Sequence, residues 1–94
     1  MKYYTYKLTF RFDSRYYYYG VHRTRGVPAT DGYFGSGNAI KEYKILYGQD
    51  CFQKDVLRIF DTRSESLQEE EKLVGDSWKT DPFCLNRMPG GHIS

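Results

Sequence analysis

Apolar and polar side chains alternate along the first part of the chain, over residues 3–12. One face of this segment carries Tyr4, Tyr6, Leu8 and Phe10, and the other carries Thr5, Lys7, Thr9 and Arg11. A period of two predicts a strand with one buried face. Asp13-Ser14-Arg15 then supplies turn-forming residues, and the β-forming residues 16–23 predict a second strand. The two segments together predict a β-hairpin.

A glycine-rich stretch, residues 24–37, follows the hairpin and fits no regular period, so we expect a surface loop there. Apolar side chains then recur at helical spacing, which predicts a helix from about Asn38 to Tyr47. Either Ser36 or Asn38 can cap the start of this helix, and Gly48 is expected to end it.

The second half of the chain predicts one more strand and one more helix. Residues 52–60 are rich in β-forming and apolar side chains and are expected to form the third strand. Thr62-Arg63-Ser64-Glu65 has the pattern of a capping box, which predicts a helix that Gly75 would end. The tail is expected to be loop-like, with a short extended piece at residues 83–86.

The element order ββαβα predicts an α+β domain with a small, mainly antiparallel three-stranded sheet flanked by helices. A chain of 94 residues has room for one hydrophobic core, so we expect a single domain over residues 1–94. The ten tyrosines are interpreted first as packing residues, because tyrosine combines a large apolar ring with a polar tip.

Charge is distributed unevenly along the chain. Residues 1–58 hold ten Lys/Arg against five Asp/Glu, whereas residues 59–94 hold four against seven. This polarity suits a phosphate-binding surface beside an acidic metal ligand, although solvated faces of ordinary elements explain it equally well. Cys51 and Cys84 lack metal-binding spacing and are expected to be buried thiols in a reducing compartment. The chain has no segment long enough to span a membrane and no secretory signal, so no membrane partner is expected.

Glu70 is the most informative single position. Leu67, Glu70 and Val74 lie at i, i+3 and i+7 of the second predicted helix, which places Glu70 within or beside its apolar stripe. A carboxylate that faces a core is costly unless a cation or hydrogen-bond donors compensate it. The alternative is that residues 69–71 form a solvated acidic run near the start of a helix.

The second predicted strand supplies a further clue. Tyr18, Gly20 and His22 share one of its faces, and Tyr6 on the neighbouring strand can reach the same face. Glycine inside a strand often marks a close approach by a ligand or by another part of the chain. Taken singly, each tyrosine is more simply interpreted as a core residue, and His22 as a surface imidazole.

Several stretches of the chain, in order, resemble the GIY-YIG endonuclease family. TYKLTFRFDSRYYYYGVHRT resembles the paired strands of the family, with Tyr4-Thr5-Tyr6 at the first motif and Tyr18-Tyr19-Gly20 at the second. DGYFGSG followed by a helix ending in YG, the glutamate in LQEEEKLV and the closing LNRMPGGH resemble small phage-encoded and homing-type members. The resemblance covers nearly the whole chain.

The resemblance implies a metal-dependent endonuclease, encoded by a phage, that hydrolyses DNA phosphodiester bonds in the cytoplasm of a bacterial host. Glu70 would hold one Mg²⁺ or another divalent cation such as Mn²⁺. Tyr6 or Tyr18 would help to activate the attacking water. His22 would take part in the proton transfer, since its pKa is near neutral by default. Asn86 matches a position that supports the active site.

The chain departs from the family at the arginine that most members carry on a helix after the second motif. Loop residues around Pro28 stand at that spacing, and Arg23 is our candidate for the transition-state charge. One alternative is therefore a catalytically weak or inactive relative that binds nucleic acid or a partner protein. Another is a small structural protein unrelated to nucleases. With no separate DNA-reading module, specificity would come from loops, a homodimer or a second subunit.

Overall fold

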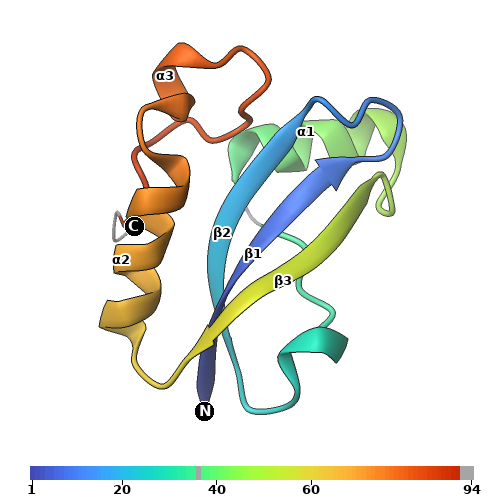
Figure 1. Cartoon of the computed structure of the whole chain (residues 1–94). Coiled ribbons are helices and arrows are strands. Elements are labelled where there is room, and N and C mark those ends of the chain that lie inside the picture. Colours follow the sequence, from blue (N-terminus) through green and yellow to red (C-terminus); the bar gives the residue numbers. More distant parts are fainter. Residues whose placement is uncertain (36, 92–94) are drawn as a thin grey trace.

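A computed structural model describes residues 1–35 and 37–91 of the chain. Three strands form one antiparallel sheet in the order β2-β1-β3 (Figure 1). Their bounds are Lys2–Phe10 for β1, Tyr17–Thr24 for β2 and Phe52–Phe60 for β3. β1 lies in the centre and pairs with both neighbours. The α+β class and the predicted antiparallel sheet are confirmed, and β3 has the predicted bounds.

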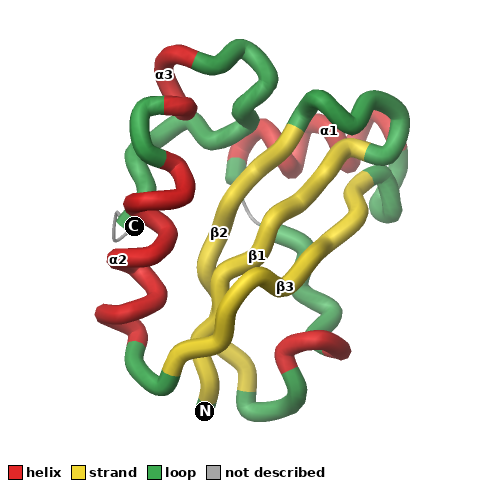
Figure 2. Tube along the Cα trace, viewed as in Figure 1, coloured by secondary structure: helices red, strands yellow, loops and turns green. Residues whose placement is uncertain are grey.

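Four helical segments surround the sheet (Figure 2). They are the 3-10 turn η1 (Pro28–Thr30) and the helices α1 (Asn38–Tyr47), α2 (Arg63–Val74) and α3 (Ser77–Thr80). α1 lies behind the sheet in Figure 1, and α2 packs on the other side, against all three strands. The two main helices occupy the predicted segments, whereas η1 and α3 are short turns that the hydrophobic pattern does not predict.

The hairpin register explains the alternation in β1. Tyr6 lies opposite Gly20 and Leu8 opposite Tyr18, so these four residues share one face of the sheet. The apolar side chains of β1 on this face join a buried cluster with α1 and β3: Tyr4, Tyr6, Leu8, Phe10, Ala39, Ile40, Cys51, Phe52 and Leu85. Tyr4 and Tyr6 are buried in this cluster, which confirms the predicted packing role for these two tyrosines.

The start of α1 differs from the prediction. The N-cap is Gly37, which offers no side chain to the helix, and Asn38 is the first helical residue instead of the cap. The other candidate, Ser36, lies outside the described residues. Gly48 ends the helix as predicted, with a φ of 104° that few residues other than glycine adopt. Among the described residues, therefore, no side chain caps the backbone N–H groups of the first turn of α1.

The capping box at the start of α2 is confirmed. The Thr62 hydroxyl oxygen accepts a hydrogen bond from the Glu65 backbone N–H at 3.3 Å, and the hydroxyl donates to the Glu65 carboxylate at 2.8 Å. Gly75 ends the helix, as expected. The start of α2 is thus stabilised by two hydrogen bonds between Thr62 and Glu65.

The tail returns to the sheet after α3 (Figure 2). The Tyr17 N–H donates to the Phe83 carbonyl at 3.1 Å, and the Leu85 N–H donates to the Tyr17 carbonyl at 2.7 Å. These bonds form a short parallel bridge between Tyr17 and Cys84, which confirms the extended piece predicted for the tail. The outer edge of β2 is therefore covered by the tail over part of its length.

Candidate active site

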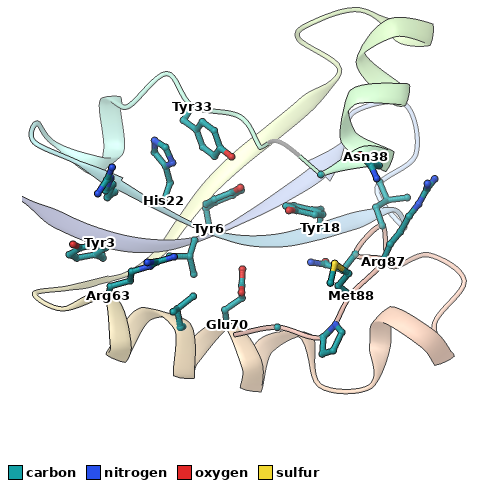
Figure 3. A pocket seen from close by; sticks show the side chains of 18 residues that line it. Tyr3, Tyr6, Tyr18, His22, Tyr33, Asn38, Arg63, Glu70, Arg87 and Met88 are labelled. Atoms are coloured by element: carbon teal, nitrogen blue, oxygen red, sulfur yellow. The ribbon is translucent and has the colours of Figure 1, made fainter. Parts of the chain in front are cut away.

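A cleft of about 630 Å³ opens along β2, between α2 and the tail on one side and the loop before α1 on the other (Figure 3). The site residues expected from the sequence all contribute to its lining: Tyr6, Tyr18, His22, Arg23, Glu70 and Asn86. They come from both strands of the hairpin, from α2 and from the tail. Residues that are far apart in the sequence therefore meet around one cavity.

Gly20 is required because the Tyr6 ring lies across it. A Cβ atom at position 20 would lie 2.3 Å from the Tyr6 hydroxyl oxygen and 2.4 Å from the ring carbon that carries it. Tyr18 lies against Gly37 in the same way, with a Cβ there only 3.0 Å from its ring. The two glycines thus provide the space in which the phenol groups of Tyr6 and Tyr18 line the cleft.

Both phenols are protonated at neutral pH. Burial raises the pKa of Tyr18 to about 12, with a further contribution from the negative charge of Glu70. Burial also raises the pKa of Tyr6 far above its usual range, because only 1% of this residue is exposed. Each group therefore presents a hydroxyl that donates hydrogen bonds, and neither is a ready phenolate base.

Glu70 faces the cleft, and its neighbours in the acidic run do not share its setting. Glu70 is half-buried, whereas Glu71 is exposed and Glu69 lies 3.5 Å from the Arg58 guanidinium. Burial raises the pKa of Glu70, and a hydrogen bond donated by the Gly91 N–H to Oε1 at 2.8 Å partly offsets this rise. The interpretation of Glu70 as part of a solvated run is thus wrong.

Three arginines contribute to the lining of the cleft. Arg87 pairs with Glu42 at 3.0 Å, while Arg23 and Arg63 have no ion pair with any part of the chain that the structure describes. The uncapped start of α1, at Asn38, lies on the same cavity. Because Arg23 and Arg63 outnumber the one lining carboxylate, Glu70, the cleft has a positive balance that favours an anion.

Arg63 was not among the residues expected from the sequence. It lies seven positions before Glu70, on the same face of α2, and both residues line the cleft (Figure 3). This spacing was available as a signal once Glu70 had been singled out. The predicted Arg23 also lines the cleft, from β2.

His22 is held between aromatic rings. It stacks on Tyr33 with a centroid distance of 3.7 Å and an angle of 7°, and it meets the Tyr4 ring edge-on. Its Nε2 lies 3.8 Å from Asp31 Oδ2. Burial lowers the pKa of His22, although the Asp31 charge opposes this effect. The imidazole is therefore mostly neutral at pH 7 and can accept a proton.

Lys54 holds the loop that carries Asp31 and Tyr33. Its Nζ donates to the Asp31 carbonyl at 3.1 Å, to the Tyr33 carbonyl at 2.6 Å and to the Tyr4 hydroxyl at 2.8 Å. The Tyr4 hydroxyl in turn donates to the Asp31 carboxylate. Sequence reasoning missed Lys54, Asp31 and Tyr33, since no motif connects them and only the folded chain brings them together.

Asn86 connects the tail to β2. Its Oδ1 accepts from the Tyr19 N–H at 2.9 Å, and its Nδ2 donates to the Tyr19 carbonyl at 2.8 Å. The side chain is 8% exposed. Both ends of its amide are thus engaged with the backbone, so Asn86 is suited to hold the wall of the cleft and not to contact a reacting group.

Glu70 lacks the neighbours of a self-contained metal cage. Within residues 1–35 and 37–91, no three His, Cys, Asp or Glu side chains come together as a cluster that could hold an ion. Mg²⁺ is commonly bound through one or two carboxylates, with water and substrate phosphate completing its coordination. A single carboxylate beside arginine side chains in an open cleft fits that mode of binding.

The fold and cleft define a small α+β domain with a tyrosine- and arginine-lined cavity around one carboxylate. The chain is 36% identical over 91 residues to "Putative endonuclease segB" of Enterobacteria phage T4, covering 97% of this chain and 40% of that protein. It is 34% identical over 74 residues to "Putative endonuclease segE" of the same phage, covering 79% of this chain and 35% of that protein. For "Putative endonuclease segC", also of this phage, the identity is 32% over 89 residues, covering 95% of this chain and 43% of that protein.

The chain spans about two fifths of the length of these relatives. No family model and no solved structure matches it. Among the helices that the structure describes, none is long and apolar enough to cross a membrane.

Proposed function

We propose that the cleft is the active site of a metal-dependent endonuclease of the GIY-YIG type, which hydrolyses phosphodiester bonds in DNA. The observation that carries the proposal is the half-buried Glu70, which faces two phenols, Tyr6 and Tyr18, in a cavity lined by arginines. The similarity to phage T4 proteins named endonucleases supports it and favours a phage-encoded enzyme.

Glu70 would hold one divalent cation, Mg²⁺ or Mn²⁺, through a carboxylate oxygen. When bound, such an ion supplies charge stabilisation at the scissile phosphate and its leaving oxygen. Arg63 and Arg23 would bind phosphate oxygens, and Arg23 remains our candidate for the charge that develops in the transition state. The excess of cations over the single carboxylate keeps the DNA backbone in the cleft.

The pKa values of the two phenols and of the imidazole suggest different roles for them in the reaction. Because Tyr6 and Tyr18 stay protonated, their hydroxyls would orient the attacking water and a phosphate oxygen by donating hydrogen bonds. His22 is neutral and would take the proton that this water releases at a ring nitrogen. Asn86 would act indirectly, by holding the tail against β2.

Nicking of supercoiled plasmid tests the proposal. We expect nicking by the wild-type chain in Mg²⁺ and none in EDTA. Glu70→Ala should abolish nicking, while Glu71→Ala, which removes the exposed neighbouring carboxylate, should leave it intact. A folded wild-type protein that never nicks, or full activity in Glu70→Ala, contradicts the proposal.

A second function is favoured by one observation, the excess of arginines over carboxylates in the cleft. A domain with this lining can bind DNA phosphates without cleaving them. DNA binding that weakens steeply with salt, with no nicking in Mg²⁺ or Mn²⁺, would identify such a binding module. A homodimer or a second subunit stays a prediction, and sedimentation of the protein with and without DNA would test it.

A further inference from the structure

The tail touches α2 at two consecutive glycines. A Cβ atom at Gly90 would lie 2.3 Å from the Glu70 carbonyl oxygen, 2.7 Å from its carbonyl carbon and 2.8 Å from Glu71 Cα. These are backbone atoms of a helix and cannot move aside as a flexible side chain can. Gly91 has a φ of +75°, and a Cβ there would lie 3.0 Å from the Leu67 carbonyl oxygen. Both positions therefore require glycine for this contact.

The same contact holds the Glu70 side chain. The Gly91 N–H donates to Glu70 Oε1 at 2.8 Å, while Gly90 packs on the backbone of the same residue. None of the described residues donates to Glu70 Oε2. One carboxylate oxygen is thus occupied by the tail, and the other is left for a ligand in the cleft.

The other end of this tail segment is fixed to the sheet. Asn86 makes two hydrogen bonds to the Tyr19 backbone, and Leu85 is buried in the core. Residues 87–90 contribute to the lining of the cleft between these two anchors. A short segment of fixed length therefore connects β2, which carries Tyr18, to the helix that carries Glu70 (Figure 3).

We propose that Gly90 and Gly91 are positioning residues for Glu70, and that residues 86–91 form a strap between β2 and α2. The strap fixes the carboxylate in one orientation, with Oε1 on the Gly91 N–H and Oε2 directed to the cleft, so that a cation is bound through one oxygen. Outer hydrogen bonds that orient a metal-binding carboxylate commonly raise the affinity of a site for its metal. The catalytic consequence rests on the proposed function, whereas the orientation of Glu70 does not.

Hydrogen exchange at the Gly91 amide tests the orientation directly, by NMR and without any activity. The wild-type amide should be protected. Glu70→Gln keeps a hydrogen-bond acceptor and should keep the protection. Glu70→Ala should remove the protection, so that the Gly91 amide exchanges at least tenfold faster. Rapid exchange at Gly91 in the folded wild type, or equal protection in Glu70→Ala, overturns the proposal. None of these variants changes the glycines, so the test does not depend on whether a glycine variant folds.

The glycines are tested with Gly90→Ala against Gly32→Ala, because a Cβ at Gly32 meets nothing within 4 Å. We expect Gly90→Ala to lower the nicking rate by tenfold or more and to raise the Mg²⁺ concentration for half-maximal rate, with DNA affinity in EDTA unchanged. Gly32→Ala should match the wild type. Wild-type behaviour of Gly90→Ala at every Mg²⁺ concentration overturns the role of the strap. A wild-type protein that never nicks defeats the proposed function alone, and exchange at Gly91 still decides the orientation of Glu70.

Discussion

The two faces of the central strand β1 differ in how they are packed. The face toward α1 carries Tyr4, Tyr6, Leu8 and Phe10, each between 0 and 6% exposed, within one aromatic cluster. The face toward α2 carries Tyr3, Thr5 and Lys7, of which only Thr5 is fully buried. α2 itself buries no more than Ser66 and Val74 completely.

The proposed site therefore joins two layers of the domain that differ in packing. Large aromatic side chains pack together on the α1 face and are almost completely removed from water. The α2 face of β1 carries fewer buried side chains, and the helix there is held by the Thr62 cap, by Val74 and by the backbone of the tail. Glu70 is therefore carried by the less tightly packed layer, and Tyr6 and Tyr18 by the more tightly packed one.

The largest effect should come from truncation on the α1 face. Leu8→Ala removes a side chain that is 0% exposed and should lower the free energy of unfolding by about 2–5 kcal/mol. Leu67→Ala on α2 removes the same atoms from a half-buried site and should cost less than half as much. Urea denaturation of both variants measures the contrast, and equal losses would show that the two layers do not differ.

Gly20→Ala should have the second largest effect on stability, because it disturbs the α1 face at the point where that face meets the cleft. The added methyl group must displace the Tyr6 phenol, which we expect to cost about 1–3 kcal/mol of stability and most of the nicking activity. Gly26→Ala is the matched control, since a Cβ there lies 3.7 Å from its nearest neighbour, the Thr24 hydroxyl. Unchanged stability in Gly20→Ala would mean that Tyr6 moves freely.

Thr5→Val should act in the opposite direction, on the α2 face. Thr5 Oγ1 is buried and has no hydrogen-bond partner within the described residues. Replacing the hydroxyl by a methyl group of similar shape removes this unsatisfied group and should raise stability by about 1 kcal/mol. Thr9→Val, at a half-buried site on the same face, should change stability little. A melting temperature that falls in Thr5→Val would point to a partner for Oγ1.

Arg63→Ala tests whether α2 contributes to DNA binding. We expect stability to change by less than about 0.5 kcal/mol, because the guanidinium makes no ion pair in the part of the chain described. DNA affinity should fall, and the slope of log affinity against log salt should decrease by about 1, as for one lost phosphate contact. Arg58→Ala, whose guanidinium lies beside Glu69, is the control and should leave the slope unchanged.

Glu70→Gln is expected to have a small effect on stability that depends on pH. Burial raises the pKa of Glu70 in the folded protein, so the protonated form stabilises the fold and this contribution is lost as pH rises through the folded pKa. At pH 7 the neutral Gln should therefore raise stability by less than about 1 kcal/mol. The gain should vanish below the unfolded pKa, about 4.3. A gain that persists in acid would point to packing and not to charge.

Most of the regular structure could be predicted because it follows from local periodicity. The alternation in β1, the helical spacing in α1 and the capping box of α2 each depend on residues close together in the sequence. The predicted N-cap of α1 was wrong. The cap position is set by where the backbone becomes helical, after Gly37, and not by which residues nearby have capping side chains. α3 has only four residues, too few to show a period.

The cleft was predictable only in part. Glu70 could be singled out because a carboxylate interrupts the apolar stripe of its helix, and Tyr18 because it flanks Gly20, a glycine inside a strand. Asp31, Tyr33 and Lys54 form no pattern, since their contacts join a loop to a strand about 20 residues away. The contact of Gly90 with α2 was equally hidden, because glycine in a tail predicts a loop and says nothing about what approaches it.

The ammonium group of Lys54 has a consequence for how the chain can change in evolution. By donating hydrogen bonds to the carbonyls of Asp31 and Tyr33, it divides the connection between β2 and α1 into two shorter loops. The entropy of closing a loop grows slowly with its length, so extra residues in the first part, near Gly26, should cost little. Extra residues between Asp31 and Tyr33 would instead separate carbonyls that must meet one cation. Length variation should therefore concentrate before Asp31.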